Sequence, residues 1–194
     1  MARVDGIKRG LKENNIDENL IKDIIGNGDI VNIIIRMDKL LNPIIVHQIL
    51  DACACCTGKS TIYYKQTKKY GKEIAGKTLK EKITDLGNYN FDFGNTILND
   101  DNTLTTGMYL KENGKYNCVC SAAIKAVTND SASPKKGDSN DRLMPLSYCY
   151  CCAGHFRCHL QNALDIKLKT KEIVSSPINS RGEKPCKFIF DIID

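Results

Sequence analysis

The chain has 194 residues, of which 42% are hydrophobic and 26% are charged, and its formal net charge is +5. These values are ordinary for a soluble globular protein and argue against an intrinsically disordered chain. The sequence has no apolar segment near its N-terminus and no run of about 18 apolar residues, so we expect a cytoplasmic protein without a membrane span.

The ten cysteines are the unusual feature of the composition. In a reducing cytoplasm, clustered thiols indicate metal binding or catalysis more than disulfide formation. Nine of the ten fall into three clusters, at residues 53–56, 118–120 and 149–158.

The N-terminal part of the sequence predicts a small helical cap, residues 1–57, with apolar isoleucine and leucine faces. Asp17 and Asp29 are suitable helix N-caps, and Pro43 suits a first helical turn. The predicted helices cover residues 3–13, 17–25, 29–41 and 43–55. The cap ends in the first cysteine cluster, which includes Cys53 and Cys56.

Residues 58–194 are predicted to form the second unit, and its first stretch, residues 60–83, is rich in lysine. Tyrosines stand among the lysines, as in some nucleic-acid-binding surfaces. Glu73 and Glu81 interrupt the positive charge, however, which is typical of a solvated helix surface. We do not expect nucleic acid as a partner.

An Asn-Gly pair, Asn113-Gly114, predicts a β-hairpin between residues 103–110 and 115–120. The second of these strands ends in the second cysteine cluster, Cys118 and Cys120. Residues 128–145 then have the Ser, Asp, Asn, Gly and Pro content of a flexible loop.

The third cluster is the strongest chemical signal. Cys149 and Cys151 alternate with tyrosines, which is strand spacing. Residues 153–164 have a helical apolar stripe, and His155 lies on a neighbouring stripe. Cys151 and Cys152 are then expected at or just before a helix N-terminus, where the helix dipole favours a thiolate over a thiol.

Two further strands are predicted at residues 166–174 and 186–193, and the second is apolar enough to be central in a sheet. Together the elements predict an α+β fold, with a helical N-terminal segment followed by an antiparallel sheet packed against helices.

Gly182, Cys186 and Phe188 stand in the pattern G-x-x-x-C-x-F. Through this pattern, residues 103–194 resemble the 4-vinyl-reductase-type domain, a small-molecule-binding module of bacteria and archaea. The resemblance implies an α+β fold, a small-molecule ligand and, in some members, metal-binding cysteines. Members often carry an earlier cysteine, near Ile178 here, which this sequence lacks. The chain also resembles uncharacterised cysteine-rich bacterial proteins related to hydrolases of L-2-amino-thiazoline-4-carboxylate.

The first functional hypothesis is a small-molecule-binding protein in which the cysteine clusters converge on a metal. Thiolate and imidazole favour zinc, so zinc is the expected cofactor. Sulfurs two residues apart in a straight strand are about 7 Å from each other, so this hypothesis requires the strand ends to bend. The candidate ligands are Cys53, Cys56, Cys118, Cys120, Cys149, Cys151, Cys152 and His155.

The second hypothesis is a cysteine-dependent hydrolase of a small thiazoline or amide substrate. Cys151 or Cys152 would then be the nucleophile and His155 the base one helical turn away. No acidic residue in the motif is available to orient His155. An iron–sulfur centre is a third alternative, although no ferredoxin-type spacing occurs. The sequence also leaves a homodimer open.

Overall fold

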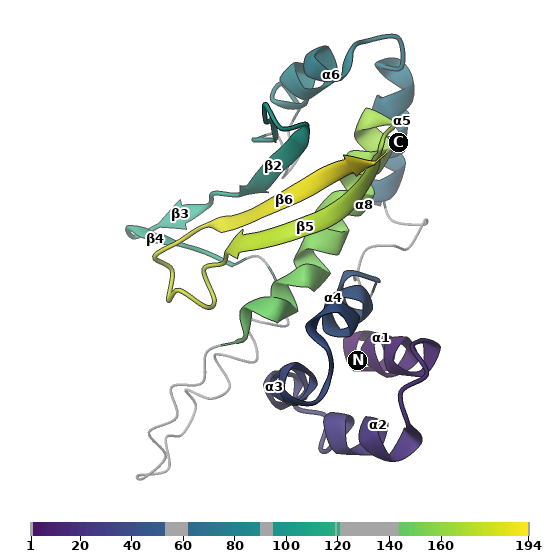
Figure 1. Cartoon of the computed structure of the whole chain (residues 1–194). Coiled ribbons are helices and arrows are strands. Elements are labelled where there is room, and N and C mark those ends of the chain that lie inside the picture. Colours follow the sequence, from purple (N-terminus) through teal and green to yellow (C-terminus); the bar gives the residue numbers. More distant parts are fainter. Residues whose placement is uncertain (1, 53–61, 90–94, 119, 121–143, 194) are drawn as a thin grey trace.

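The computed structural model describes residues 2–52, 62–89, 95–118, 120 and 144–193 (Figure 1). Cys53 and Cys56, the predicted boundary after residue 57 and nearly all of the predicted loop 128–145 lie outside these residues. The predicted α+β class is confirmed: N-terminal helices precede a four-stranded antiparallel sheet that packs against helices.

The four predicted N-terminal helices are present. Asp17 caps the second by accepting hydrogen bonds from the backbone N–H groups of Asn19 and Leu20, and Asp29 caps the third by accepting one from Asn32. These side chains satisfy N–H groups that have no partner inside the helix. The helices are α1 (Ala2–Glu13), α2 (Glu18–Ile25), α3 (Ile30–Leu40) and α4 (Pro43–Ala52).

The apolar faces of α1–α4 meet in a buried cluster, which we call the cap core. Three residues from later in the chain, Cys120, Met144 and Tyr148, complete it. The cap therefore packs against the second cysteine cluster and the segment before the third. The cap core contains Ile7, Leu11, Ile21, Ile24, Val31, Ile33, Ile34, Met37, Val46, Ile49 and Leu50 as well.

The lysine-rich segment forms two helices, α5 (Ile62–Glu73) and α6 (Leu79–Leu86), with a capping box between Thr78 and Glu81 at the start of α6. Helix α5 packs closely along α8 (Tyr150–Leu164). A Cβ atom at Gly71 of α5 would lie 2.2 Å from the backbone oxygen of Asn162. Only glycine permits this approach of the two helices.

The sheet has the strand order β1 (Ile97–Leu98), β2 (Thr103–Met108), β6 (Cys186–Ile193), β5 (Lys167–Ser175), with antiparallel neighbours. As predicted, the last strand is central. Strand β5 lies at an edge, and its register with β6 shifts twice. Exposed lysines occupy alternate positions along β5, at residues 167, 169 and 171.

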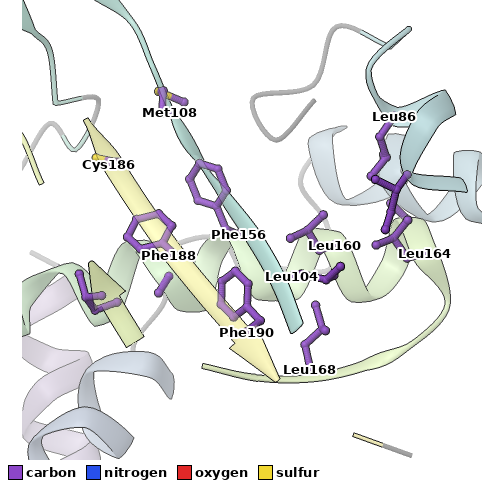
Figure 2. Packing of buried hydrophobic residues seen from close by; sticks show 14 of the residues in the cluster. Leu86, Leu104, Met108, Phe156, Leu160, Leu164, Leu168, Cys186, Phe188 and Phe190 are labelled. Atoms are coloured by element: carbon purple, nitrogen blue, oxygen red, sulfur yellow. The ribbon is translucent and has the colours of Figure 1, made fainter. Parts of the chain in front are cut away.

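Helix α8 covers one face of the sheet (Figure 1). Phe188 and Phe190 of β6 are fully buried, and the ring of Phe188 lies 5.3 Å from that of Phe156 on α8. Leu104 of β2 and Leu160 of α8 belong to the same cluster (Figure 2). We call this cluster the sheet core.

Two strand predictions near the cysteines differ from the structure. The predicted hairpin forms around the left-handed turn Asn113-Gly114, but only as a short pair, β3 (Lys111–Glu112) with β4 (Lys115–Tyr116). One further hydrogen bond continues this pairing, from the N–H of Asn117 to the carbonyl of Leu110 at 2.9 Å. Residues 103–108 pair instead with β6.

The second prediction, a strand around Cys149 and Cys151, is wrong. Leu146–Cys149 form a 3₁₀ turn, η2, that runs directly into α8. Pro145 precedes this turn with φ of −56°, a value that suits a helical start. Cys151 and Cys152 do lie in the first turn of a helix, as expected.

Two side-chain contacts join the cap to η2 and the start of α8. The rings of His47 on α4 and Tyr150 on α8 stack with 3.8 Å between their centroids. The hydroxyl of Ser147 donates to the carboxylate of Asp38 at 2.7 Å. The start of α8 is therefore tied to the cap.

Candidate functional site

Five cysteines from three segments come together near the start of α8, and we call them the thiol cluster. Cys118 and Cys120 lie in the chain after β4, Cys149 and Cys152 at the junction of η2 and α8, and Cys186 is the first residue of β6. In sequence they are up to 68 residues apart, from 118 to 186. The fold, not local spacing, brings them together.

Two sulfur pairs form the centre of the thiol cluster. Cys186 shares a hydrogen bond with Cys118, and Cys152 shares one with Cys120. The pairing, followed by burial and by the other nearby thiols, raises the pKa of Cys186 and of Cys152 well above the ordinary value for a thiol. These two side chains are therefore protonated at neutral pH.

Cys149 lies beside both pairs. Burial raises the pKa of its thiol to about 12, and the nearness of Cys118 and Cys120 adds to this rise. A hydrogen bond with Ser176, just after β5, acts in the opposite direction. Cys149 is thus a buried neighbour with a polar partner of its own.

Hydrogen bonds also reach the sulfur atoms after β4. The backbone N–H of Cys120 donates to the sulfur of Cys118 at 3.4 Å. The sulfur of Cys120 and the hydroxyl of Tyr148 are 3.6 Å apart and share a hydrogen bond. The sulfur atoms of Cys118 and Cys120 therefore both take part in hydrogen bonds.

The thiol cluster lies where the two cores meet. Cys120 belongs to the cap core and Cys149 and Cys186 to the sheet core. Cys152 packs against both. A ligand held here would tie the helical cap to the sheet.

Comparisons with models of protein families, with curated proteins and with solved structures found no match. The resemblance to the 4-vinyl-reductase-type domain therefore stays a prediction. The three residues that carry it have clear local roles: Gly182 turns with a φ of +82°, Cys186 joins the thiol cluster, and Phe188 fills the sheet core.

The predicted metal ligands differ in where the structure places them. Cys118, Cys120, Cys149 and Cys152 come together, and Cys151 is buried next to Cys152. Cys53 and Cys56 lie outside the described residues. In the part of the chain that the structure describes, no three His, Cys, Asp or Glu side chains are already arranged around a point that suits a metal ion.

Cys186 was missed as a candidate ligand. The signal that could have found it was present, because a cysteine at the first position of a strand lies at the end of that strand, where other chain segments enter or leave the sheet. The ring of His155 lies near that of Tyr63 on α5 and near those of Phe156 and His159 on α8. None of these ring partners belongs to the thiol cluster.

The expected thiolate at the helix N-terminus is not found at Cys152, since its pKa is raised instead of lowered. The hydrogen bond with Cys120 is the main cause, followed by burial and by the neighbouring thiols Cys120, Cys149 and Cys151. A nucleophilic cysteine needs an accessible, low-pKa thiol, so Cys152 does not suit the nucleophile role of the hydrolase alternative.

No helix in the described ranges has the length and apolarity needed to cross a bilayer. Two surface hollows are described, and neither is lined by a residue of the thiol cluster. One, of about 410 Å³, is lined by Tyr64 and four lysines of α5, and the other by charged residues around α6. The small-molecule pocket expected beside the cysteines stays a prediction.

Proposed function

We propose that this protein is a metal-binding module in which Cys118, Cys120, Cys152 and Cys186 bind one zinc ion through four sulfur atoms. The observation that carries the proposal is the meeting of two sulfur pairs, from three separate segments, where the cap core and the sheet core join. Four thiolates in a tetrahedron are a common structural zinc site.

The hydrogen bonds to sulfur support this choice. Outer partners that donate to ligand atoms orient them and tune the metal. The Cys120 N–H bond to Cys118 and the Tyr148 hydroxyl beside Cys120 are partners of that kind. Cys149, with its own bond to Ser176, is left as a neighbour of the site.

Electrostatics also supports a cation. The hydrogen bond within each sulfur pair, then burial, then the neighbouring thiols raise the pKa values of Cys152 and Cys186. A divalent cation reverses this effect, because it stabilises several thiolates at once. Binding would draw the two sulfur pairs onto one ion, with zinc–sulfur distances of about 2.3 Å.

Such a centre would stabilise the junction of the two units more than it would perform chemistry. Four sulfur ligands leave no open position for a substrate, and closed sites of this kind contribute folding free energy. We therefore expect zinc removal to loosen the cap from the sheet.

The test is metal analysis of protein purified without oxygen, combined with cobalt substitution. We expect one zinc per chain, and with Co²⁺ the intense sulfur-to-metal absorption of a thiolate site. Cys152→Ser and Cys186→Ser, one from each sulfur pair, should lower the zinc affinity at least about tenfold, or 1.4 kcal/mol.

The matched control is Cys158→Ser, because Cys158 lies on α8 but outside the thiol cluster, and its raised pKa comes mainly from burial. It should bind zinc like the unchanged protein. Equal zinc affinity in all three variants, or no sulfur-to-cobalt absorption, would overturn the proposal.

A further inference from the structure

His159 lies on the side of α8 that faces α5, and its side chain is fully buried, with a relative exposure of 0%. The edge of the Tyr63 ring contacts it, with 4.5 Å between the ring centroids. Its Nδ1 atom is 3.3 Å from the hydroxyl oxygen of Thr67 on α5. These contacts fix the orientation of the imidazole.

The hydrogen bonds of Thr67 favour one tautomer. A threonine hydroxyl has one hydrogen to donate. The carbonyl of Tyr64 can only accept, and it lies 3.0 Å from the Thr67 hydroxyl, so we assign the hydrogen to this bond. With this assignment the oxygen of Thr67 accepts from His159, Nδ1 carries the ring proton, and Nε2 carries an unprotonated lone pair.

Within the described part of the chain, that Nε2 atom is buried and has no hydrogen-bond partner. A buried polar atom without a partner costs roughly 1–3 kcal/mol, so such atoms usually have a partner or a function. An unprotonated imidazole nitrogen whose other nitrogen donates a hydrogen bond is the arrangement found in metal-ligating histidines.

His155 supplies a second imidazole one helical turn earlier. The centroids of the two rings are 4.6 Å apart, and their planes are inclined at 73°. Residues four apart lie on the same face of a helix, and two histidines at this spacing can bind one metal ion. His155 is only partly buried, so the pair extends from the surface to the interior.

We propose that His155 and His159 together bind a divalent transition-metal ion of the zinc class, at a second site distinct from the thiol cluster. The pair faces α5 through Tyr63 and Thr67, whereas the thiol cluster reaches α8 through Cys149 and Cys152. Thr67 is a positioning residue, because it acts on the ion only through His159. Solvent completes the coordination on the exposed side of His155.

The test is a zinc titration of the full chain with ¹⁵N-labelled histidine, in reducing, oxygen-free buffer, with each imidazole followed by NMR. The chain has three histidines, so His47 is an internal control. Before zinc is added, His159 should show a protonated Nδ1 and an unprotonated Nε2. One titration step should then shift Nε2 of His159 and one ring nitrogen of His155 together, without affecting His47.

His155→Gln, at a partly exposed position that should not disturb folding, should weaken this step at least tenfold, and His47→Gln should leave it unchanged. Thr67→Val should weaken it about 10–100-fold, as loss of an outer partner does, and Thr67→Ser should restore it. Unmoved imidazole signals at millimolar zinc, or an unchanged step in His155→Gln, would overturn the proposal. The sulfur-to-cobalt absorption reports on the thiol cluster separately, so either site can fail alone.

Discussion

Arg157 of α8 binds Asp51 of α4 through two nitrogen atoms, with 2.7 Å between Nη2 and Oδ2 and 3.4 Å between Nε and Oδ1. The hydroxyl of Thr170 on β5 donates to the same carboxylate at 2.6 Å. One side chain of the cap thus contacts both the central helix and the sheet. Three charge-assisted bonds of this kind are stronger than those of an exposed ion pair.

We therefore expect Asp51→Ala to lower the free energy of unfolding by about 1–3 kcal/mol, since it leaves the side chains of Arg157 and Thr170 without their acceptor. Chemical denaturation would measure the change. Glu73→Ala is the control, because the Glu73 pair with Lys69 is largely exposed and should be worth less than about 1 kcal/mol. Equal effects of the two substitutions would contradict the structural role of Asp51.

The apparent zinc affinity of the thiol cluster should rise with pH. The pKa values of Cys152 and Cys186 are raised, so both thiols must lose protons when zinc binds. Each released proton steepens the dependence by up to about tenfold in affinity per pH unit. Competition with a chelator between pH 6 and 8, together with direct measurement of proton release, would check this; a flat profile would exclude these two ligands.

Acid should destabilise the metal-free protein through His159. Burial, followed by the nearby His155, lowers the pKa of His159 to about 4 from an ordinary value of 6.5. Below 6.5 the unfolded chain takes up a proton that the folded one does not, so stability falls as the pH decreases toward 4. The loss amounts to at most about 3 kcal/mol.

Urea unfolding at a series of pH values, with a chelator present, would measure this loss. His159→Phe removes the titrating group, so its stability should depend less on pH between 6.5 and 4. His47→Phe is a comparison at a partly exposed position. If the two variants have the same profile as the unchanged chain, His159 is not the source.

Gly71 should not accept a larger residue. A Cβ atom there would meet the backbone oxygen of Asn162 at 2.2 Å, and a backbone atom cannot move aside as a side chain can. We expect Gly71→Ala to push α5 away from α8 and to cost about 1–3 kcal/mol. Gly76→Ala is the control, because no atom lies within 4 Å of the Cβ position there. Thermal unfolding of both variants would show whether the contact matters.

Much of the fold could be predicted from local pattern. The N-terminal helices follow from apolar periodicity and from the caps Asp17 and Asp29, and β6 from its alternating phenylalanines. The errors arose where the local sequence pattern and the tertiary contacts favour different structures. The Tyr-Cys alternation at 148–151 has strand spacing, but Pro145 and the continuation into α8 make it helical.

The site was predicted less well than the fold. Cys118 and Cys120 lie near Cys149 and Cys152, but within the described residues no three such side chains are arranged around a metal position, so the predicted site stays a prediction. Cys186 is 28 residues beyond the last cysteine of the third cluster, and only the pairing of β6 with β2 brings it to Cys118. The predicted thiolate at Cys152 was also wrong. The prediction considered only the helix dipole, whereas the fold places other thiols beside Cys152 and its pKa is raised.

The edge strand β5 bears on self-association. Among the described residues its outer backbone groups have no neighbouring strand in the sheet, and exposed lysines stand at residues 167, 169 and 171. If two copies joined edge to edge about position 169, like charges would oppose each other in successive pairs, which is destabilising. Charge repulsion along this edge therefore disfavours the pairing of two β5 strands from different molecules.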